Sequence, residues 1–158
     1  MKLVFQVTPK QRLIITEQAV EQMLAHVQRC FWHCEAGGVL LGRHLLDSED
    51  VVVDEVTVPQ STDRRTRFSF FRSKKHEAIA KERWHAEAST LAYLGLWHTH
   101  PEDSPTPSSV DMSDWVQAVA KDTFDGPRLF FSIVGRKEIR VWTKNRAGCI
   151  RELKREAL

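Results

Sequence analysis

Two histidines and a following aspartate have the residue types and the spacing of a metal site. His98 and His100 are separated by one residue, and in a β-strand this spacing places both side chains on the same face. Asp111 follows on a second element. Two imidazoles, one carboxylate and an open fourth position match the ligand set of a catalytic zinc ion, where bound water supplies the nucleophile. The sequence therefore predicts a zinc site with the ligands His98, His100 and Asp111.

The segment around these residues is similar to the signature of a peptidase family. The stretch GLWHTHPEDSPTPSSVDMSDW (95–115) carries His98, His100, Ser108 and Asp111 at the spacing of the JAMM metallopeptidases, also called the MPN+ or JAB family. The resemblance implies an α/β fold with a single JAB/MPN domain, in which a mixed β-sheet is flanked by helices. It also implies zinc-dependent hydrolysis of an amide bond at the carboxyl end of ubiquitin or a ubiquitin-like protein.

A structural explanation of the same residues is the alternative. His98 and His100 would then be half-exposed strand residues, while Ser108 and Asp111 would form a capping box at the start of a helix. Each half of this alternative is plausible alone. The coincidence of both halves with the family spacing favours the metal site.

The resemblance also assigns residues to the catalytic step. Glu35 stands just before a glycine-containing strand in EAGGVLLG, the place of the family's catalytic glutamate, so it is the expected proton acceptor. Gly37 and Gly38 would let the backbone turn sharply and aim Glu35 at the metal. Ser108 is expected to donate a hydrogen bond to the oxyanion, with Ser109 or the backbone satisfying the helix end.

The imidazole N–H groups of a zinc site also need partners, and the sequence does not identify them. Asp114, one turn after Asp111, is a candidate. An exposed helix residue that adds negative charge near the helix N-terminus is the alternative interpretation of Asp114.

Composition bounds the class of protein. The chain has 158 residues, which predicts one domain over 1–158, and its hydrophobic and charged fractions of 42% and 28% are typical of a globular protein. A net charge of +2 gives no indication of a nucleic-acid partner. Neither an apolar run of membrane-spanning length nor a signal peptide is evident, and three cysteines favour a reducing cytoplasm.

A second group of metal-ligating residue types competes with the first. His26, Cys30, His33 and Cys34 lie close to helical spacing. Structural zinc sites usually draw two ligand pairs from separate elements, and no partner pair is evident here. We therefore expect Cys30 to end an apolar helix face and His33 to face solvent.

Hydrophobic periodicity and turn residues predict strands that alternate with three helices. The predicted strands cover 2–7, 12–15, 37–45, 50–59, 68–72, 91–97, 128–134 and 138–143, and the last two form a hairpin around Gly135. The predicted helices cover 17–30, a segment from the cap Ser73 to about Ala88, and 109–122.

Some of these segments carry a more specific prediction. The strand 91–97 is nearly all apolar and is expected to be central, with both faces buried. Residues 60–67 are expected to form a polar, basic loop and 149–158 a weakly specified tail. The apolar face of the second helix is expected to consist of Ile79, Ala80, Trp84 and Ala88.

The predicted basic loop is a candidate for substrate binding. Residues 60–67 lie where the family carries a substrate-binding insertion, so the resemblance makes Arg64, Arg65 and Arg67 candidate substrate-binding residues. A solvated basic loop is the alternative. An extended protein tail that adds a strand to a sheet edge would gain main-chain hydrogen bonds before it reached the metal.

The blocks EAGGVLLG, RRTRFSFFR and 95–115 resemble the small bacterial JAB proteins of anti-phage CBASS operons. This resemblance implies that the partner is the carboxyl-terminal tail of a conjugated cGAS-like nucleotidyltransferase. One alternative is a JAB peptidase that trims a ubiquitin-like sulfur carrier. Another is a non-catalytic MPN scaffold, although intact ligand positions argue against it because such domains usually lose them.

Overall fold

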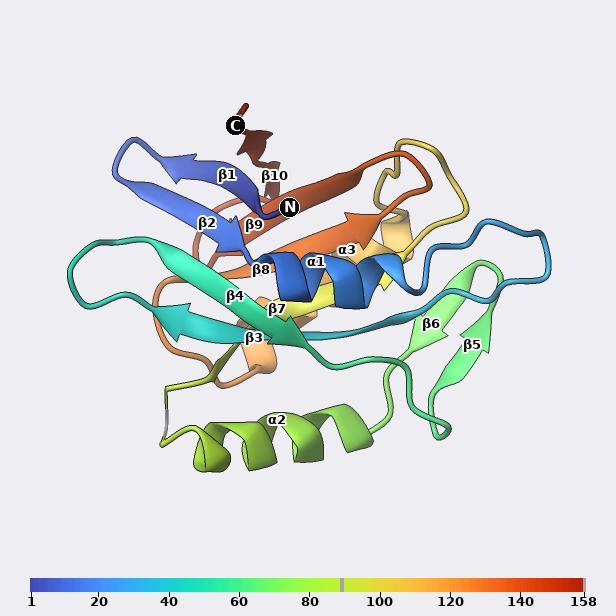
Figure 1. The fold of residues 1–158 in the computed structure, drawn as a ribbon, viewed down its shortest axis with the longest axis horizontal. Helices are drawn as coiled ribbons and strands as arrows, with labels where there is room; N and C mark the ends of the chain where they lie inside the picture. Colours follow the sequence, from blue (N-terminus) through green and yellow to red (C-terminus); the bar gives the residue numbers. More distant parts are fainter. Residues whose placement is uncertain (89, 158) are drawn as a thin grey trace.

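A mixed β-sheet of nine strands forms the centre of the molecule (Figure 1), which we describe from a computed structural model covering residues 1–88 and 90–157. The order across the sheet is β10-β9-β8-β7-β3-β4-β2-β1-β11. The pairs β2–β4 and β7–β8 are parallel and the others antiparallel. Their bounds are β1 Leu3–Thr8, β2 Gln11–Ile15, β3 Gly37–His44, β4 Val51–Val56, β7 Ala92–Thr99, β8 Arg128–Val134, β9 Ile139–Asn145, β10 Arg151–Glu152 and β11 Lys154–Arg155.

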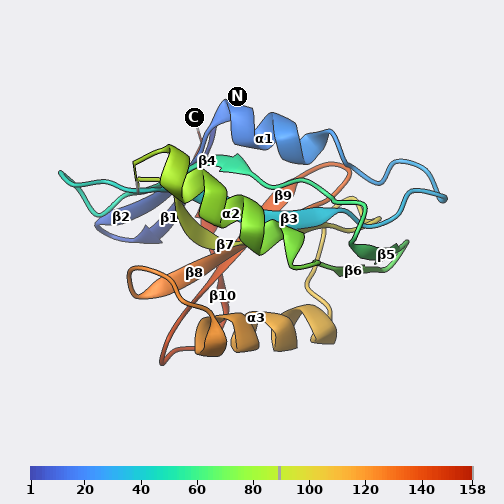
Figure 2. The same ribbon diagram turned by 90° about the horizontal axis from the view of Figure 1, so that it is seen from below.

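Three helices cover this sheet. Helix α1 (Glu17–Leu24) lies on one face and α3 (Ser109–Lys121) on the opposite face, while α2 (Lys75–Ala86) lies beside β3 and β7 (Figure 2). Each face has its own core cluster, and β7 contributes to both, with Leu94 and Trp97 on the α1 side and Leu96 on the α3 side. Among the described residues, no helix combines the length and apolar character needed to cross a membrane.

This architecture confirms the predicted α/β class with a mixed sheet. The strand predicted at 91–97 is β7, which is central, packed on both faces and two residues longer at its end. The helix predicted at 109–122 is α3, and the hairpin predicted around Gly135 is formed by β8 and β9.

The first helix is shorter than predicted. It ends at Leu24 rather than residue 30, and Phe31, which the periodicity placed on its apolar stripe, is 75% exposed. The cause is Gln28, whose buried side chain donates to the carbonyl groups of His33 and Arg67 and accepts from the hydroxyl of Thr99. These partners lie far along the chain, and helical spacing does not report them.

Two segments that were predicted to lack regular structure, residues 60–67 and the C-terminal tail, contain short strands. Residues 60–67 are not only a loop, because β5 (Arg64–Thr66) pairs with β6 (Ser69–Phe71) to form a separate two-stranded hairpin. The tail is also specified: β10 pairs with β9 and β11 with β1, so the last residues join the two outer strands of the sheet. Leu153, between these short strands, is buried in the core.

The second helix begins and packs differently from the prediction. Its N-cap is Lys74, which makes no capping hydrogen bond with its side chain, and the predicted cap Ser73 bonds to the preceding loop instead. Of the expected apolar face, Ala80 packs against the core, but Trp84 and Ala88 are exposed. The buried residue of α2 is His76.

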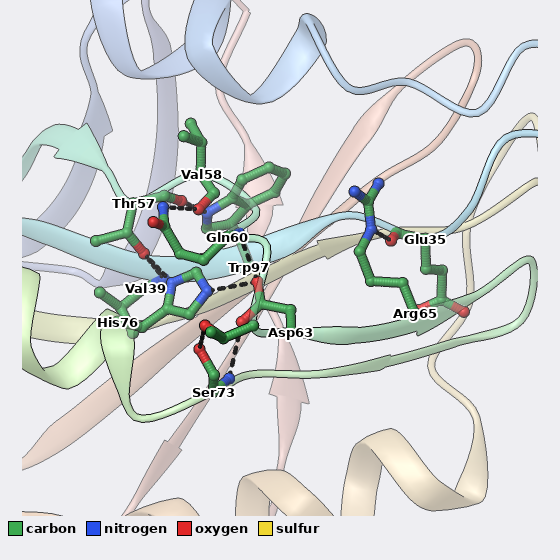
Figure 3. A network of polar contacts seen from close by, with 11 residues as sticks. Glu35, Val39, Thr57, Val58, Gln60, Asp63, Arg65, Ser73, His76 and Trp97 are labelled. Carbon is green, nitrogen blue, oxygen red and sulfur yellow. Dashed lines mark hydrogen bonds and ion pairs between the residues drawn. The ribbon is translucent and has the colours of Figure 1, made fainter.

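A buried polar network fixes α2 and the hairpin to the sheet (Figure 3). The Thr57 hydroxyl lies 2.6 Å from Nδ1 of His76, and Nε2 of His76 lies 2.8 Å from Oδ2 of Asp63. Asp63 also accepts hydrogen bonds from the amides of Gln60 and Ser73, both at 2.8 Å. The side chains of Asp63 and His76 are 0% and 2% exposed, so the contact between them and the neighbouring hydrogen bonds are shielded from solvent.

The network predicts a pH-dependent contribution to stability. Burial raises the pKa of Asp63, but hydrogen bonds from Gln60, His76 and Ser73 outweigh this and lower it to about 2. A carboxyl group with a depressed folded-state pKa stabilises the protein above its unfolded value, and this stabilisation is lost as the pH falls through the folded value. We expect the free energy of unfolding to differ between wild type and Asp63→Asn by about 2 kcal/mol more at pH 5–7 than near pH 2. Urea denaturation at a series of pH values measures this difference; a constant difference from pH 7 to pH 3 would contradict the assignment.

Candidate active site

Strand β7 delivers the two histidines to the end of the sheet. His98 lies in β7, and His100 follows the last residue of the strand. Their Nε2 atoms are 3.1 Å apart, and the two residues are 6% and 8% exposed. The side chains therefore converge, as the spacing predicted.

The pairing of β3 with β7 brings Glu35 to the same place. Gly37 pairs with His98 in antiparallel register. Beyond it, Thr99 donates its amide to the carbonyl of Ala36 at 2.8 Å, and the Ala36 amide donates to the Thr99 hydroxyl at 2.9 Å. The next residue back is Glu35, which is 4% exposed and has a carboxylate oxygen within 4.8 Å of the ligand nitrogens of both histidines.

Glycine is needed at the two positions near Glu35 for a different reason from the one expected. Gly37 and Gly38 begin the regular strand β3 rather than a sharp turn, and the positive φ angles among the described glycines occur elsewhere. A side chain would not fit at either position: a Cβ atom on Gly38 would lie 2.1 Å from the Thr57 carbonyl oxygen, and one on Gly37 would lie 2.6 Å from that of Trp97. Glycine is required here because neighbouring strands approach closely.

Asp111 joins the histidines from the first turn of α3. Its Oδ1 lies 3.3 Å from Nε2 of His98, and its Oδ2 lies 3.1 Å from Nε2 of His100. The same carboxylate accepts a hydrogen bond from the Ser108 amide at 2.8 Å, and the Asp111 amide donates to the Ser108 hydroxyl oxygen at 3.1 Å. The capping box considered as an alternative is therefore present, and it holds Asp111 toward the histidines.

This cap corrects the prediction for Ser108. We expected Ser109 or the backbone to satisfy the helix end and leave Ser108 free, but Ser108 is the N-cap of α3. The two roles are nevertheless compatible, because a hydroxyl has two acceptor sites and one donor. Capping uses an acceptor site and leaves the proton of Ser108 available for donation.

The two carboxylates have opposite acid–base properties. Burial raises the pKa of Glu35 to about 8, against the opposing charge of His100. Burial also acts to raise the pKa of Asp111, but hydrogen bonds from His100 and His98 hold it far below its usual range. A pair of carboxyl groups with separated pKa values is typical of a site that divides acid–base work from charge stabilisation.

A carboxylate that the sequence did not identify supports His100. Glu102 Oε1 lies 2.8 Å from Nδ1 of His100, which leaves Nε2 directed at Asp111. Burial acts to lower the pKa of His100, but its hydrogen bonds to Asp111 and Glu102 raise it to about 8. Asp114, the expected partner, makes no hydrogen bond to His98 among the described contacts. In the sequence, the only indication that Glu102 supports His100 is its position two residues after that histidine.

The geometry fits a tetrahedral metal ion. Zinc bound to nitrogen and oxygen at about 2.0–2.1 Å places its ligand atoms about 3.3 Å apart. The Nε2 atoms of His98 and His100 are 3.1 Å apart, and they lie 3.3 Å and 3.1 Å from Oδ1 and Oδ2 of Asp111 respectively, so each histidine faces a different oxygen of the carboxylate. Glu35 and the two histidines also form a group with metal-ligand spacing, so a cation here would be bordered by a second carboxylate. Two imidazoles and an ionised carboxylate are the donor set that zinc prefers.

The competing cysteine group is not assembled. Within residues 1–88 and 90–157, the group of metal-ligating side chains is Glu35 with His98 and His100, and neither Cys30 nor Cys34 belongs to one. Cys30 lies in a loop after α1 rather than on a helix face, and its amide donates to Nδ1 of His33. The His33 side chain is half-buried rather than fully in solvent.

The three candidate arginines make three different contacts. Arg65 Nε donates to the carbonyl oxygen of Glu35 at 2.7 Å (Figure 3), and Arg67 Nη1 donates to that of Cys30 at 3.0 Å. The guanidinium of Arg64 lies over the ring of Phe71 at 5.3 Å from its centroid. Two of the three thus bind the chain's own backbone, and a shared role in substrate binding stays a prediction.

Curated relatives share most of the chain. A protein from Pseudomonas aeruginosa named CD-NTase/cGAS isopeptidase is 41% identical over 128 residues, which covers 80% of this chain and 79% of the relative. A protein of the same name from Vibrio cholerae is 32% identical over 147 residues, covering 92% and 90% of the two chains. These names agree with the group of bacterial JAB proteins that the sequence blocks resemble.

The fold and the family comparison agree with these relatives. The solution structure of a protein from Desulfitobacterium hafniense superimposes with a TM-score of 0.61 and 25% identity, and the match covers 87% of each chain. The family of prokaryotic homologs of the JAB domain matches residues 16–145, which include Glu35, both histidines, Ser108 and Asp111. The chain belongs to the prokaryotic JAB domain family.

Proposed function

We propose that this protein is a zinc-dependent isopeptidase that releases a cGAS-like nucleotidyltransferase from conjugates made through its carboxyl-terminal tail, as part of anti-phage CBASS defence. The observation that carries the proposal is the convergence of His98, His100 and Asp111 within 3.1–3.3 Å, with Glu35 buried beside them. The names of the curated relatives support the substrate class. The free cysteines Cys30, Cys34 and Cys149 fit a reducing cytoplasm.

A zinc ion held by His98, His100 and Asp111 would supply a bound water whose pKa is lowered from about 15.7 toward 7. Glu35 is the proton acceptor for that water, since its carboxylate is buried, borders the ligands and makes no hydrogen bond among the described residues. In the next step the same carboxyl group would pass the proton to the leaving amine. The amide bond is thereby hydrolysed to a carboxylate and an amine.

Ser108 is the proposed hydrogen-bond donor to the tetrahedral intermediate. Its hydroxyl oxygen caps α3 beside the ligand Asp111, and its proton is available to an oxyanion formed next to the cluster. Asp111 is already engaged with the Ser108 amide, so the serine and the ligand are held as one unit. A single oxyanion donor of this kind contributes about 3–4 kcal/mol to catalysis in comparable sites.

The β5–β6 hairpin is the proposed binding site for the tail of the substrate. It lies against Glu35, whose amide donates to the Thr66 carbonyl at 2.7 Å. In the described part of the chain β6 pairs with β5 alone, so a tail can add as a further strand and gain main-chain hydrogen bonds. The exposed guanidinium of Arg64 lies on the same hairpin.

The metal content of purified protein tests the ligands. We expect about one equivalent of zinc in the wild type and little in the double variant His98→Ala, His100→Ala, because two of three nitrogen or oxygen donors are removed. Elemental analysis after dialysis measures it. The control Cys30→Ser, Cys34→Ser should keep its zinc, and loss from this variant with retention by the histidine variant would move the site to the cysteine loop.

Glu35→Gln separates the proton acceptor from the ligands. We expect the variant to fold and keep zinc, while kcat falls by at least about 10²-fold, because the amide cannot accept the proton. Glu102→Gln is the matched comparison: it weakens the support of a ligand histidine and should lower zinc affinity about 10–100-fold. Near-normal turnover of Glu35→Gln at neutral pH and saturating substrate would end the assignment.

The substrate class is tested with fusion proteins. Wild type and Glu35→Gln are incubated with the cognate nucleotidyltransferase joined through its tail to a carrier protein, and with a ubiquitin-like sulfur carrier extended beyond its terminal glycines. We expect wild type alone to cleave the nucleotidyltransferase fusion, at one bond, as read by intact-mass spectrometry. Cleavage of the sulfur-carrier fusion with the nucleotidyltransferase fusion left intact would replace the proposed substrate with the alternative one.

A further inference from the structure

The backbone of Glu35 is held on both sides by the β5–β6 hairpin. Its amide donates to the Thr66 carbonyl at 2.7 Å, and its own carbonyl accepts from Nε of Arg65 at 2.7 Å (Figure 3). Adjacent residues of one strand thus bind both polar groups of the Glu35 main chain. The Glu35 carboxylate, in contrast, makes no hydrogen bond among the described residues, so polar contacts fix only the main chain from which the side chain extends.

The hairpin that holds Glu35 is itself fixed at its base. Asp63 directly precedes β5 and makes the buried hydrogen bond with His76 of α2. Nδ1 of His76 is hydrogen-bonded to the Thr57 hydroxyl, and the Thr57 carbonyl accepts a hydrogen bond from Nε1 of Trp97 at 2.9 Å. Trp97 is the residue before the ligand His98. An unbroken set of buried polar contacts therefore joins the strand that bears the ligands to the hairpin that bears Arg65.

We propose that Arg65 is a positioning residue for Glu35, and that the Asp63–His76–Thr57 network keeps Arg65 in register with the metal ligands. The inference rests on the proposed function, in which Glu35 moves the proton. It assigns to Arg65 a role distinct from substrate binding. Loss of its hydrogen bond leaves the Glu35–Ala36 peptide held only through the Ala36 amide, so the Glu35 side chain is less firmly positioned beside the ligands.

Arg64 offers a matched control on the same strand. Both arginines belong to β5 and both are exposed, but Arg64 contacts the Phe71 ring and makes no hydrogen bond to Glu35 among the described residues. Removing either side chain deletes one positive charge from the same surface. A general effect of charge on substrate binding would therefore appear in both variants, whereas positioning of Glu35 would appear in one.

Steady-state kinetics of Arg65→Ala and Arg64→Ala on a cleavable tail fusion make the first test. For Arg65→Ala we expect kcat to fall about 10–10²-fold with KM within about twofold, because a misplaced catalytic group slows chemistry without weakening substrate binding. Arg64→Ala should act, if at all, through KM, because Arg64 contacts no part of Glu35 and is a candidate contact of the substrate tail. In the Glu35→Gln background, Arg65→Ala should cause no further loss of kcat. In the wild-type background, Arg65→Lys should retain part of the kcat that Arg65→Ala loses, because lysine supplies one donor.

Amide hydrogen exchange supplies a readout that needs no turnover. The Glu35 amide is protected by Thr66. We expect its exchange, followed by nuclear magnetic resonance, to accelerate at least about tenfold in Arg65→Ala and to stay as in wild type in Arg64→Ala. Asp63→Asn should accelerate it as well, through loosening of the hairpin.

The outcomes test the role of Arg65 and the proposed function separately. A raised KM with unchanged kcat in Arg65→Ala, together with unchanged exchange of the Glu35 amide, makes Arg65 a substrate-binding residue and overturns the inference. If wild type cleaves no tail fusion, the proposed function fails, and the exchange experiment still decides whether Arg65 holds Glu35.

Discussion

Glu35 faces His100 because β3 and β7 pair in antiparallel register, with Gly37 opposite His98. The rest of the site depends on this pairing. It sets a carboxylate from one strand against two imidazoles from another, at the end of the sheet where both strands stop. The absence of side chains at Gly37 and Gly38 allows the neighbouring backbone to approach, so the pairing and the catalytic geometry have the same steric requirement.

The surroundings of the two carboxylates then divide the chemistry between them. Asp111 receives hydrogen bonds from a helix N-terminus and lies between two histidines, an environment that favours the charged form. Glu35 has a buried side chain and polar contacts only through its main chain, an environment that raises the pKa of its carboxyl group and so its affinity for a proton. Residues of the same chemical type acquire different tasks because one is satisfied through its side chain and the other through its backbone.

Features that depend on local spacing could be predicted from the sequence. His98 and His100 at the end of an apolar strand, and Ser108 and Asp111 at a helix start, lie close together along the chain. The structure brings His98, His100 and Asp111 together, whereas Ser108 caps α3, which was not the role expected for it. The prediction failed where distant residues decide the conformation. Gln28, in the segment after α1 ends at Leu24, bonds to partners near residues 67 and 99, and Asp63 pairs with His76 across the hairpin. The three arginines of residues 64–67 look alike in sequence, and only their geometry separates the one that binds Glu35.

The central place of β7 has a consequence for biosynthesis. The strand is flanked by β3 on one side and by β8, which ends at Val134, on the other. Because chains are made from the N-terminus and long-range pairings form late, the strand that carries the histidines lacks a neighbour until most of the protein has left the ribosome. Chain synthesis in this order completes the sheet around His98 and His100 only when most of the protein has been made.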